Sequence, residues 1–355
     1  MDFSNLIGVL IVTHNAHDNL KIILDTLANN FFEIVVADSS QNLWGLSNKY
    51  PIKYYHCPNL KMPEKLRIFS KKISSEFILI HPDGEVLNLE SLYNLKAQLQ
   101  NSTEFISSTV SQNLSLVKQD NMSIIRPRNY IKFVDHSKYC IEEKPNLEQC
   151  LNPYHQMIWG LHRASLFKQI IDPLSNIDWE QFQGQNVTLF ERAFNVFMHK
   201  NGRVLVSTLP LFLRNNALSE EKASMKIQNI ETWHTCYIQE SETHRSFLLL
   251  LSKSLSTCFR FKPDEVKIML LRAIKNEISS QENIKPSFLR RIIRKILKLV
   301  LISKKENYNY ENKNISGIRV EVECKLMTNS EFNLFVVGLY PFLLKYQESI
   351  KAFNK

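Results

Sequence analysis

The chain has 355 residues, of which 44% are apolar and 22% are charged. These values are close to those of ordinary globular proteins and exclude a largely disordered chain, and the length fits two domains, or one α/β domain with a large extension. Lysine and arginine together (44) exceed aspartate and glutamate (35) by nine, and this positive charge favours anionic partners such as phosphate-bearing substrates, membrane surfaces or nucleic acid.

Several common sites are absent from the sequence. The six cysteines include no C-x-x-C pair of zinc-ribbon or redox spacing, and we interpret them as reduced core thiols. With eight glycines, the chain has neither a G-x-G-x-x-G nor a Walker phosphate-binding loop. The first residues do not resemble a signal peptide, and no window reaches the ~18 apolar residues that a membrane span requires. We therefore expect a cytoplasmic protein.

The first ninety residues alternate between short apolar runs and helical patterns. The predicted strands are residues 7–12, 33–37, 54–55 and 77–80. The predicted helices are residues 18–30 and 64–73. Nearly continuous apolar runs are typical of strands buried on both faces, and alternation of strands with helices predicts a mostly parallel sheet with right-handed crossovers.

Polar residues follow three of these predicted strands directly. They are Thr13-His14-Asn15, Asp38-Ser39-Ser40 and His81-Pro82-Asp83. In an open parallel sheet, ligands bind beyond the carboxyl ends of the strands. We therefore predict that the three clusters face one ligand site.

The pattern after residue 100 is less regular. Residues 101–150 are polar and give weak strands at best, a helix is predicted over 187–200, and a strand followed by a loop over 203–213. Further helices are predicted over 218–250, 263–281, 286–302 and 330–352, with a short strand at 318–324 and a polar linker at 304–314. We expect an α/β domain over 1–215 and a mainly helical region over 216–355.

The segments IGVLIVTHNAHDNLKIILDTL, EIVVADSS and FILIHPDG resemble the nucleotide-sugar-dependent glycosyltransferases of the GT-A fold, particularly the family-2-like bacterial enzymes. The resemblance covers residues 6–90 and, more weakly, 155–215. It implies a GT-A-like, Rossmann-like sheet, a nucleotide-sugar donor, and a glycan or lipid-linked acceptor hydroxyl in surface polysaccharide or glycoconjugate synthesis. Inversion by single displacement is expected, because one carboxylate base suffices and no covalent nucleophile is evident.

The sequence departs from this family at the metal-binding motif. Where the family has Asp-x-Asp, this chain has His81-Pro82-Asp83, with Glu85 two residues further on. In the family the motif holds a divalent cation that bridges the donor diphosphate, because a hard cation with oxygen ligands neutralises the charge on the leaving group. The resemblance therefore implies Asp83, with Glu85 or His81, as ligands of Mg²⁺ or Mn²⁺.

Two alternatives to this metal site stay open. Cationic side chains, Lys65 and Arg67 among them, are candidates for neutralising the diphosphate without a metal. Taken alone, Pro-Asp-Gly is also the sequence of an ordinary turn that closes a strand.

The resemblance also implies residues that recognise the nucleotide. Thr13 and Asn15 line its pocket, and Asp38, followed by Ser39, corresponds to the acid that recognises the base or ribose. A carboxylate suits that role because it accepts hydrogen bonds from ribose hydroxyls or a base N–H. The alternative is that Asp38-Ser39-Ser40 forms a helix cap or a turn.

Glu191 corresponds to the family's general base, which deprotonates the acceptor hydroxyl from a helix after the acceptor-binding region. Asp178 and Glu180 are rival candidates, because any carboxylate at this place suits proton removal as the new bond forms. The alternative for Glu191 is a helix glutamate favoured by the helix dipole.

Acceptor contacts are expected around residues 159–163. Trp159 resembles the family's aromatic ring that stacks on a sugar, and His162, Arg163 and Arg214 are candidates for phosphate or acceptor contact. A core role for Trp159 and a structural role for the histidine are the alternatives.

The predicted helix 286–302 contains FLRRIIRKILKLV, with apolar residues on one face and basic residues on the other. Such a helix suits the anionic inner face of a membrane, so peripheral membrane contact is one expectation, and docking onto neighbouring helices is the alternative.

Two other functions compete with sugar transfer. One is a non-catalytic nucleotide- or glycan-binding protein that has lost an acid of the metal motif. The other is nucleic-acid binding, suggested by the positive charge, but the sequence lacks basic motifs interleaved with aromatic residues, so no nucleic-acid partner is expected.

Overall fold

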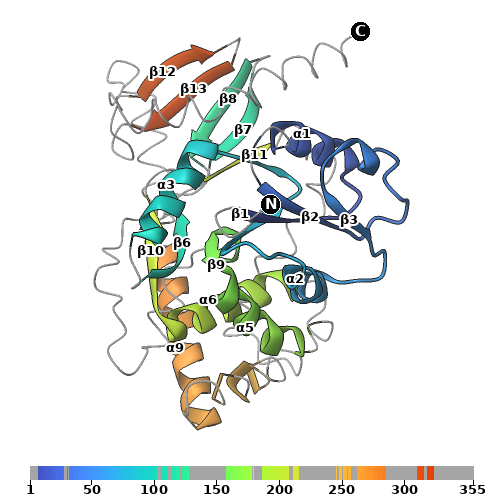
Figure 1. Ribbon diagram of the computed structural model, residues 1–355. Coiled ribbons are helices and arrows are strands. Elements are labelled where there is room, and N and C mark those ends of the chain that lie inside the picture. Colours follow the sequence, from blue (N-terminus) through green and yellow to red (C-terminus); the bar gives the residue numbers. More distant parts are fainter. Residues whose placement is uncertain are drawn as a thin grey trace, which may run out of the picture.

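The computed structural model describes residues 7–27, 30, 32–101, 105–110, 114–119, 122–127, 157–177, 179, 186–207, 211–215, 245, 248–249, 251–253, 255–256, 262–284, 310–315 and 318–323. Figure 1 shows these elements coloured along the sequence.

The main sheet has seven strands in the order β10-β6-β9-β4-β1-β2-β3. Its strands are β1 (Ile7–Thr13), β2 (Phe32–Asp38), β3 (Lys53–His56), β4 (Phe77–Pro82), β6 (Phe105–Val110), β9 (Leu161–Arg163) and β10 (Arg203–Ser207). Neighbouring strands are parallel except at β9, which is antiparallel to both β4 and β6. The mostly parallel sheet predicted from the first ninety residues is confirmed.

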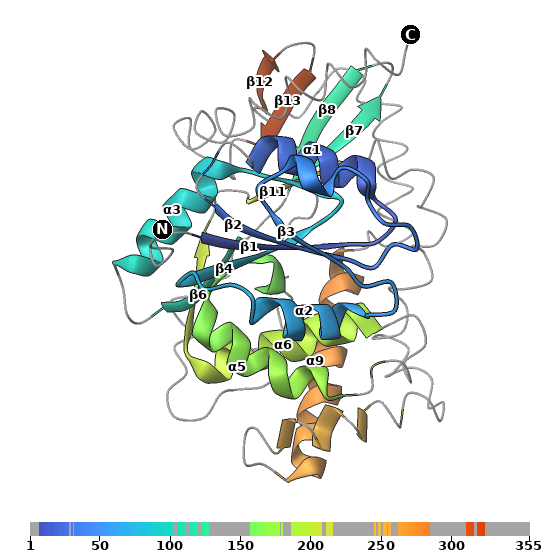
Figure 2. The same cartoon turned by 45° about the vertical axis from the view of Figure 1, so that its right-hand side comes forward.

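Helices cover both faces of this sheet (Figure 2). One face carries α1 (His17–Leu27) and α3 (Leu89–Gln100), and the other carries α2 (Met62–Ser70), α5 (Ala164–Ser175), α6 (Asn186–Asn201) and α9 (Pro263–Ile284). Alternate residues of β1 divide between the two cores: Val9 and Ile11 pack toward α1, whereas Leu10 and Val12 pack toward α2. Two apolar faces explain why this strand reads as a continuous apolar run.

A second sheet of six strands has the order β12-β13-β8-β7-β11-β5. Its strands are β5 (Glu85–Leu87), β7 (Leu114–Gln119), β8 (Met122–Pro127), β11 (Phe212–Asn215), β12 (Tyr310–Ile315) and β13 (Ile318–Glu323). Strands β4 and β5 are consecutive in the chain but belong to different sheets, and the turn Asp83-Gly84 joins them. The candidate metal motif therefore lies where the chain passes from one sheet to the other.

The strands between residues 105 and 127 are more regular than the sequence pattern predicts. Where the pattern gives weak strands at best, the structure has β6, β7 and β8. Their sequences, FISSTV, LSLVKQ and MSIIRP, mix serine and charged residues with apolar ones. β7 and β8 pair with each other, but other partners of these strands, β10, β11 and β13, lie far away in the chain, so much of the pairing cannot be seen in a local window.

The C-terminal region is only partly described. Its predicted helix 263–281 is observed as α9 and its predicted strand 318–324 as β13, whereas the predicted linker 304–314 contains all but the last residue of β12. The predicted helices 286–302 and 330–352 and most of 218–250 lie outside the described residues. No helix within the described part of the chain is long and apolar enough to cross a membrane.

Residues on both sides of position 215 share one core and one sheet. Leu251 and Leu270 belong to the cluster of buried residues that contains α5 and α6, and β13 pairs with β8. The division into domains 1–215 and 216–355 stays a prediction, but the described parts of the two segments pack together.

A buried carboxylate fixes the amino end of β2. Glu33 accepts hydrogen bonds from the backbone N–H groups of Ser74 (2.8 Å) and Ser75 (3.0 Å) and from the Lys53 ammonium (2.8 Å). Burial raises the pKa of Glu33, but the hydrogen bonds from Lys53, Ser75 and Ser74 outweigh burial and lower this pKa to about 2. The carboxylate thus joins the loop before β4 to the amino ends of β2 and β3.

We expect Glu33→Gln to lower the free energy of unfolding at pH 7 by about 1–3 kcal/mol, because a neutral amide binds these donors less strongly. A folded-state pKa below the usual 4.5 stabilises the wild type above pH 4.5, and this contribution is lost as the pH falls toward 2. The difference between wild type and variant in urea unfolding therefore shrinks over that interval; a difference that stays constant from pH 7 to pH 3 would contradict this account.

A glycine in β1 makes room for a buried side chain. A Cβ atom on Gly8 would overlap Ile73, which follows α2 and packs across the strand. We expect Gly8→Ala to lower the free energy of unfolding by about 1–3 kcal/mol through overpacking. Thermal unfolding of Gly8→Ala in an Ile73→Ala background provides the check, since the second substitution removes the clash and the two effects must then be less than additive.

Candidate functional site

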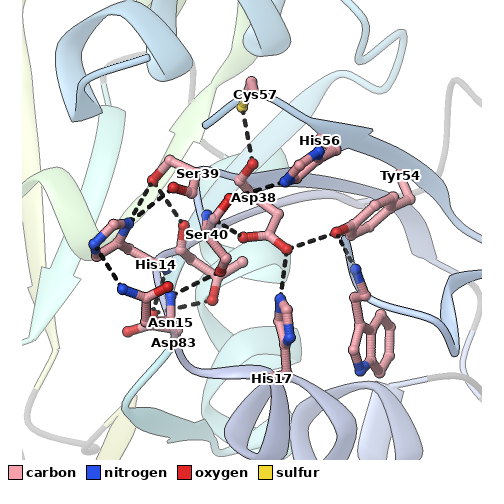
Figure 3. A network of polar contacts seen from close by, with 12 residues as sticks. His14, Asn15, His17, Asp38, Ser39, Ser40, Tyr54, His56, Cys57 and Asp83 are labelled. Atoms are coloured by element: carbon pink, nitrogen blue, oxygen red, sulfur yellow. Dashed lines mark hydrogen bonds and ion pairs between the residues drawn. The ribbon is translucent and has the colours of Figure 1, made fainter. Parts of the chain in front are cut away.

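The carboxyl ends of β1, β2 and β4 lie side by side at one edge of the main sheet. The register pairs Thr13 with Asp38 across β1 and β2, and Val12 with Pro82 across β1 and β4. The predicted meeting of the three strand ends at one edge is confirmed, and Figure 3 shows polar residues from all three ends, Asp83 among them, in one network of contacts. We call this network the strand-end site, formed by residues 13–17, 38–40, 65 and 83.

Asp83 holds the end of β1. Its Oδ2 accepts hydrogen bonds from the Thr13 hydroxyl (3.1 Å) and from the backbone N–H of His14 (3.0 Å). The next residue, Asn15, has a positive φ of 51°, a conformation that asparagine tolerates better than most residues. Its backbone N–H donates to Ser40 Oγ (2.7 Å), so the loop after β1 is fixed on both sides.

Lys65 brings a buried ammonium group to the strand-end site from α2. Its Nζ donates to Thr13 O and to Ser39 Oγ, both at 3.0 Å, and the residue is 4% exposed. Burial lowers the pKa of this ammonium, although nearby Asp83 acts in the opposite direction. Lys65, a predicted candidate for neutralising the diphosphate, lies beneath the ends of β1 and β2.

Asp38 is fully buried, with 0% exposure, and both of its carboxylate oxygens are engaged. Oδ2 accepts from the Tyr54 hydroxyl (2.6 Å) and from His17 Nε2 (2.8 Å), and Oδ1 accepts from the backbone N–H of Ser40 (2.7 Å). Burial raises the pKa of Asp38, but these hydrogen bonds outweigh it and the pKa is lowered. The direct contact with base or ribose that the resemblance implies is therefore not available to Asp38 in this arrangement.

His14 belongs to the predicted cluster after β1, whereas His17 is a contact that the sequence pattern did not single out. The side chain of His17 is 26% exposed and lies 6.3 Å from the Trp44 ring, between centroids. His14 Nδ1 lies 3.0 Å from Ser39 O, which can only accept, so this nitrogen carries the proton and Nε2 accepts from the Asn15 amide (3.1 Å). His17 could have been suspected from its position four residues after the end of β1, at the start of α1.

His81 is not at the strand-end site, and its predicted part in a metal site is wrong. Its side chain is 0% exposed and packs edge-on against Phe212, with 5.3 Å between ring centroids. Burial lowers the pKa of His81 to about 4, and Nδ1 lies 2.8 Å from Pro82 O. The imidazole is thus a neutral core group between the two sheets.

The strand-end site does not fit a resident divalent cation. Among the described residues, no three or more His, Cys, Asp or Glu side chains gather as metal ligands. Asp83 already uses Oδ2 for Thr13 and His14, and Glu85 begins β5, whose backbone pairs with β11 at Arg214. Within the described residues, the predicted ligand pair Asp83 and Glu85 therefore has no third His, Cys, Asp or Glu side chain to complete a dedicated site.

Glu191 is held toward the same edge of the sheet by a tryptophan. The short helix η3 (Met157–Trp159) precedes β9, whose Leu161 pairs with Leu79, so η3 lies toward the carboxyl end of β4. Trp159 donates its indole N–H to Glu191 Oε1 at 2.9 Å, and Glu191 is 6% exposed. Trp159 also packs against both cores, so its core and site interpretations are compatible.

Three predicted contact residues lie elsewhere. His162 is fully buried between Phe167 and Phe194, and burial lowers its pKa to about 4. Arg163 pairs with Phe77 at the amino end of β4 and donates to Glu76, so it faces the opposite edge. Arg67 follows Lys65 by two residues, about 200° around α2, so the two side chains leave the helix on different sides.

The remaining candidates are not described by the structure. Asp178 and Glu180 lie outside the described residues, and Arg214 is described only through the backbone of β11.

No protein-family model and no curated protein matches this chain. Among solved structures, S. aureus TarS 1–349 in complex with UDP-GlcNAc has a TM-score of 0.45 and 16% identity, over 77% of this chain and 73% of that one. The mannosyltransferase PcManGT from Pyrobaculum calidifontis, in complex with GDP-Man and Mn²⁺, has a TM-score of 0.39 and 11% identity over 84% and 81%. The bifunctional IspDF from Campylobacter jejuni has a TM-score of 0.33 and 11% identity, over 57% of this chain and 49% of that one. Similarities at this level carry no weight for function.

We expect Tyr54→Phe to lower the free energy of unfolding by about 1–2 kcal/mol, because buried Asp38 loses one of its donors. The neighbouring Tyr55→Phe is a matched control: the Tyr55 hydroxyl makes no hydrogen bond within the described residues, and its ring contact with Phe69 is retained. Equal urea midpoints for the two variants would show that the Tyr54–Asp38 contact does not stabilise the strand-end site.

Proposed function

We propose that this chain is a GT-A-like glycosyltransferase that moves a sugar from a nucleotide-sugar donor to an acceptor hydroxyl. The observation that carries the proposal is the strand-end site itself: the ends of β1, β2 and β4 meet at one edge, and Trp159 holds Glu191 toward that edge. The position agrees with the general rule for ligands of open parallel sheets.

The proposed reaction is a single displacement with inversion. The acceptor oxygen attacks the anomeric carbon of the donor sugar, and the bond from that carbon to the phosphate oxygen breaks. The nucleoside diphosphate leaves with the bonding electron pair, and Glu191 takes the proton of the acceptor hydroxyl. One carboxylate suffices for this chemistry, because the proton needs to leave only as the new bond forms.

The donor side of the site consists of exposed and partly exposed groups around a buried frame. Asn15 and His14 are exposed beyond the end of β1, and His17 is partly exposed above Asp38. Thr13, Ser39 and Asp38 support them from below through hydrogen bonds. In the proposal, Asp38 positions His17 and Tyr54 for the nucleoside. The exposed groups, His14, Asn15 and His17, contact the donor directly.

The acceptor is proposed to be a glycan or a lipid-linked sugar of bacterial surface polysaccharide or glycoconjugate synthesis, used at the inner face of the membrane. The sequence at 286–302, which predicts a helix with one apolar and one basic face, supports contact with a lipid surface.

The test is release of nucleoside diphosphate from a panel of nucleotide sugars, with and without added acceptors. We expect Glu191→Gln to reduce kcat by about 10²–10⁴-fold while the affinity for nucleotide stays the same, because glutamine still accepts the Trp159 hydrogen bond but cannot take a proton. Glu76→Gln, at the opposite edge of the sheet, serves as the matched control and should retain the wild-type rate.

The competing function is nucleotide or glycan binding without turnover. It is favoured by His81, which replaces an acid of the family's motif and is buried in the core. Calorimetric binding of nucleotide without any donor turnover, in wild type and Glu191→Gln alike, would establish this function in place of transfer.

A further inference from the structure

The charge of a donor diphosphate must be compensated where it binds, and the residues at 81–85 do not form the acidic cluster that would recruit a divalent cation. The side chain of residue 81 is a fully buried imidazole that packs against Phe212, so no carboxylate stands in its place. Within the described part of the chain, no other group of three acidic, histidine or cysteine side chains replaces the missing ligands.

Asp83, the retained acid, has a different task. Its Oδ2 accepts from both Thr13 and the His14 backbone, and these two bonds join the β4–β5 turn to the end of β1. A cation at this oxygen would compete with the bonds that hold the loop carrying Asn15. Asp83 therefore joins the end of β4 to the end of β1.

A cation is already built into the strand-end site. The Lys65 ammonium is buried directly beneath the ends of β1 and β2, bound to Thr13 O and Ser39 Oγ. A charge held in a buried place acts more strongly on its surroundings than the same charge in water. The Asp38 carboxylate is fully buried and accepts hydrogen bonds from Tyr54, His17 and Ser40, so no part of it is exposed where a donor would bind.

We propose that the donor diphosphate binds at the strand-end site without a divalent cation, its charge compensated by the buried Lys65 ammonium. This inference rests on the proposed function, because it presupposes a nucleotide-sugar donor. It also assigns to Asp83 the task of positioning the loop after β1, in place of metal ligation.

Binding of UDP and GDP to the full chain, measured by calorimetry in EDTA and in Mn²⁺, tests this directly. We expect the dissociation constant to agree within about twofold between the two buffers, whereas a metal-bridged site would tighten by about tenfold or more with Mn²⁺. The paramagnetic resonance signal of free Mn²⁺ gives a second readout: protein without nucleotide should leave it unchanged. Loss of that signal with wild type but not with Asp83→Asn would overturn the proposal.

Lys65→Met tests the compensating charge. We expect it to weaken nucleoside diphosphate binding by about tenfold in both buffers, while Lys71→Met, which removes an exposed ammonium just beyond the same helix, has little effect. Circular dichroism and thermal unfolding establish that both variants are folded; the comparison of buffers on the wild type stands even if Lys65→Met does not fold.

The outcomes separate this inference from the proposed function. Binding that appears only with Mn²⁺ would overturn metal-free binding and leave sugar transfer in place. Failure of every nucleoside diphosphate to bind in either buffer would overturn both.

Discussion

The strand-end site depends on a buried ammonium group. Lys65 reaches from α2 to the last carbonyl of β1 and to the first side chain after β2, and so fixes the distance between two parallel strands at the place where their hydrogen-bond ladder ends. Burying a charge costs free energy unless hydrogen bonds and opposite charges compensate it. Asp83 and Asp38 supply the opposite charges from the other elements of the edge.

The two aspartates of the site differ in what surrounds them. Asp38 is enclosed by three donors and has no exposed surface, whereas Asp83 is partly exposed and engages two donors through one oxygen. Because it is enclosed, Asp38 fixes the orientation of the His17 and Tyr54 side chains through their hydrogen bonds. Partial exposure leaves Asp83 next to the surface where a ligand of the sheet would lie, although its main contacts are with β1.

The two sheets explain why residue 81 is buried. The chain turns at Asp83-Gly84 from the main sheet into the second one, and Phe212 of the second sheet packs on the side chain at 81. A carboxylate at that position would be buried between the sheets, at a large desolvation cost. A neutral imidazole is tolerated there, so the histidine at position 81 and the packing of the second sheet belong together.

The sequence by itself determined the apolar strands β1, β2 and β4, the alternation that makes them parallel, and hence the meeting of Thr13, Asp38 and Asp83 at one edge. These features follow from local periodicity and from the direction of parallel strands, which a sequence contains. It did not determine which polar residues face a ligand: the burial of Asp38 and His81 and the contact of Trp159 with Glu191 depend on elements far apart in the chain. Only tertiary packing decided them, because exposure and hydrogen-bond partners are properties of the assembled layers.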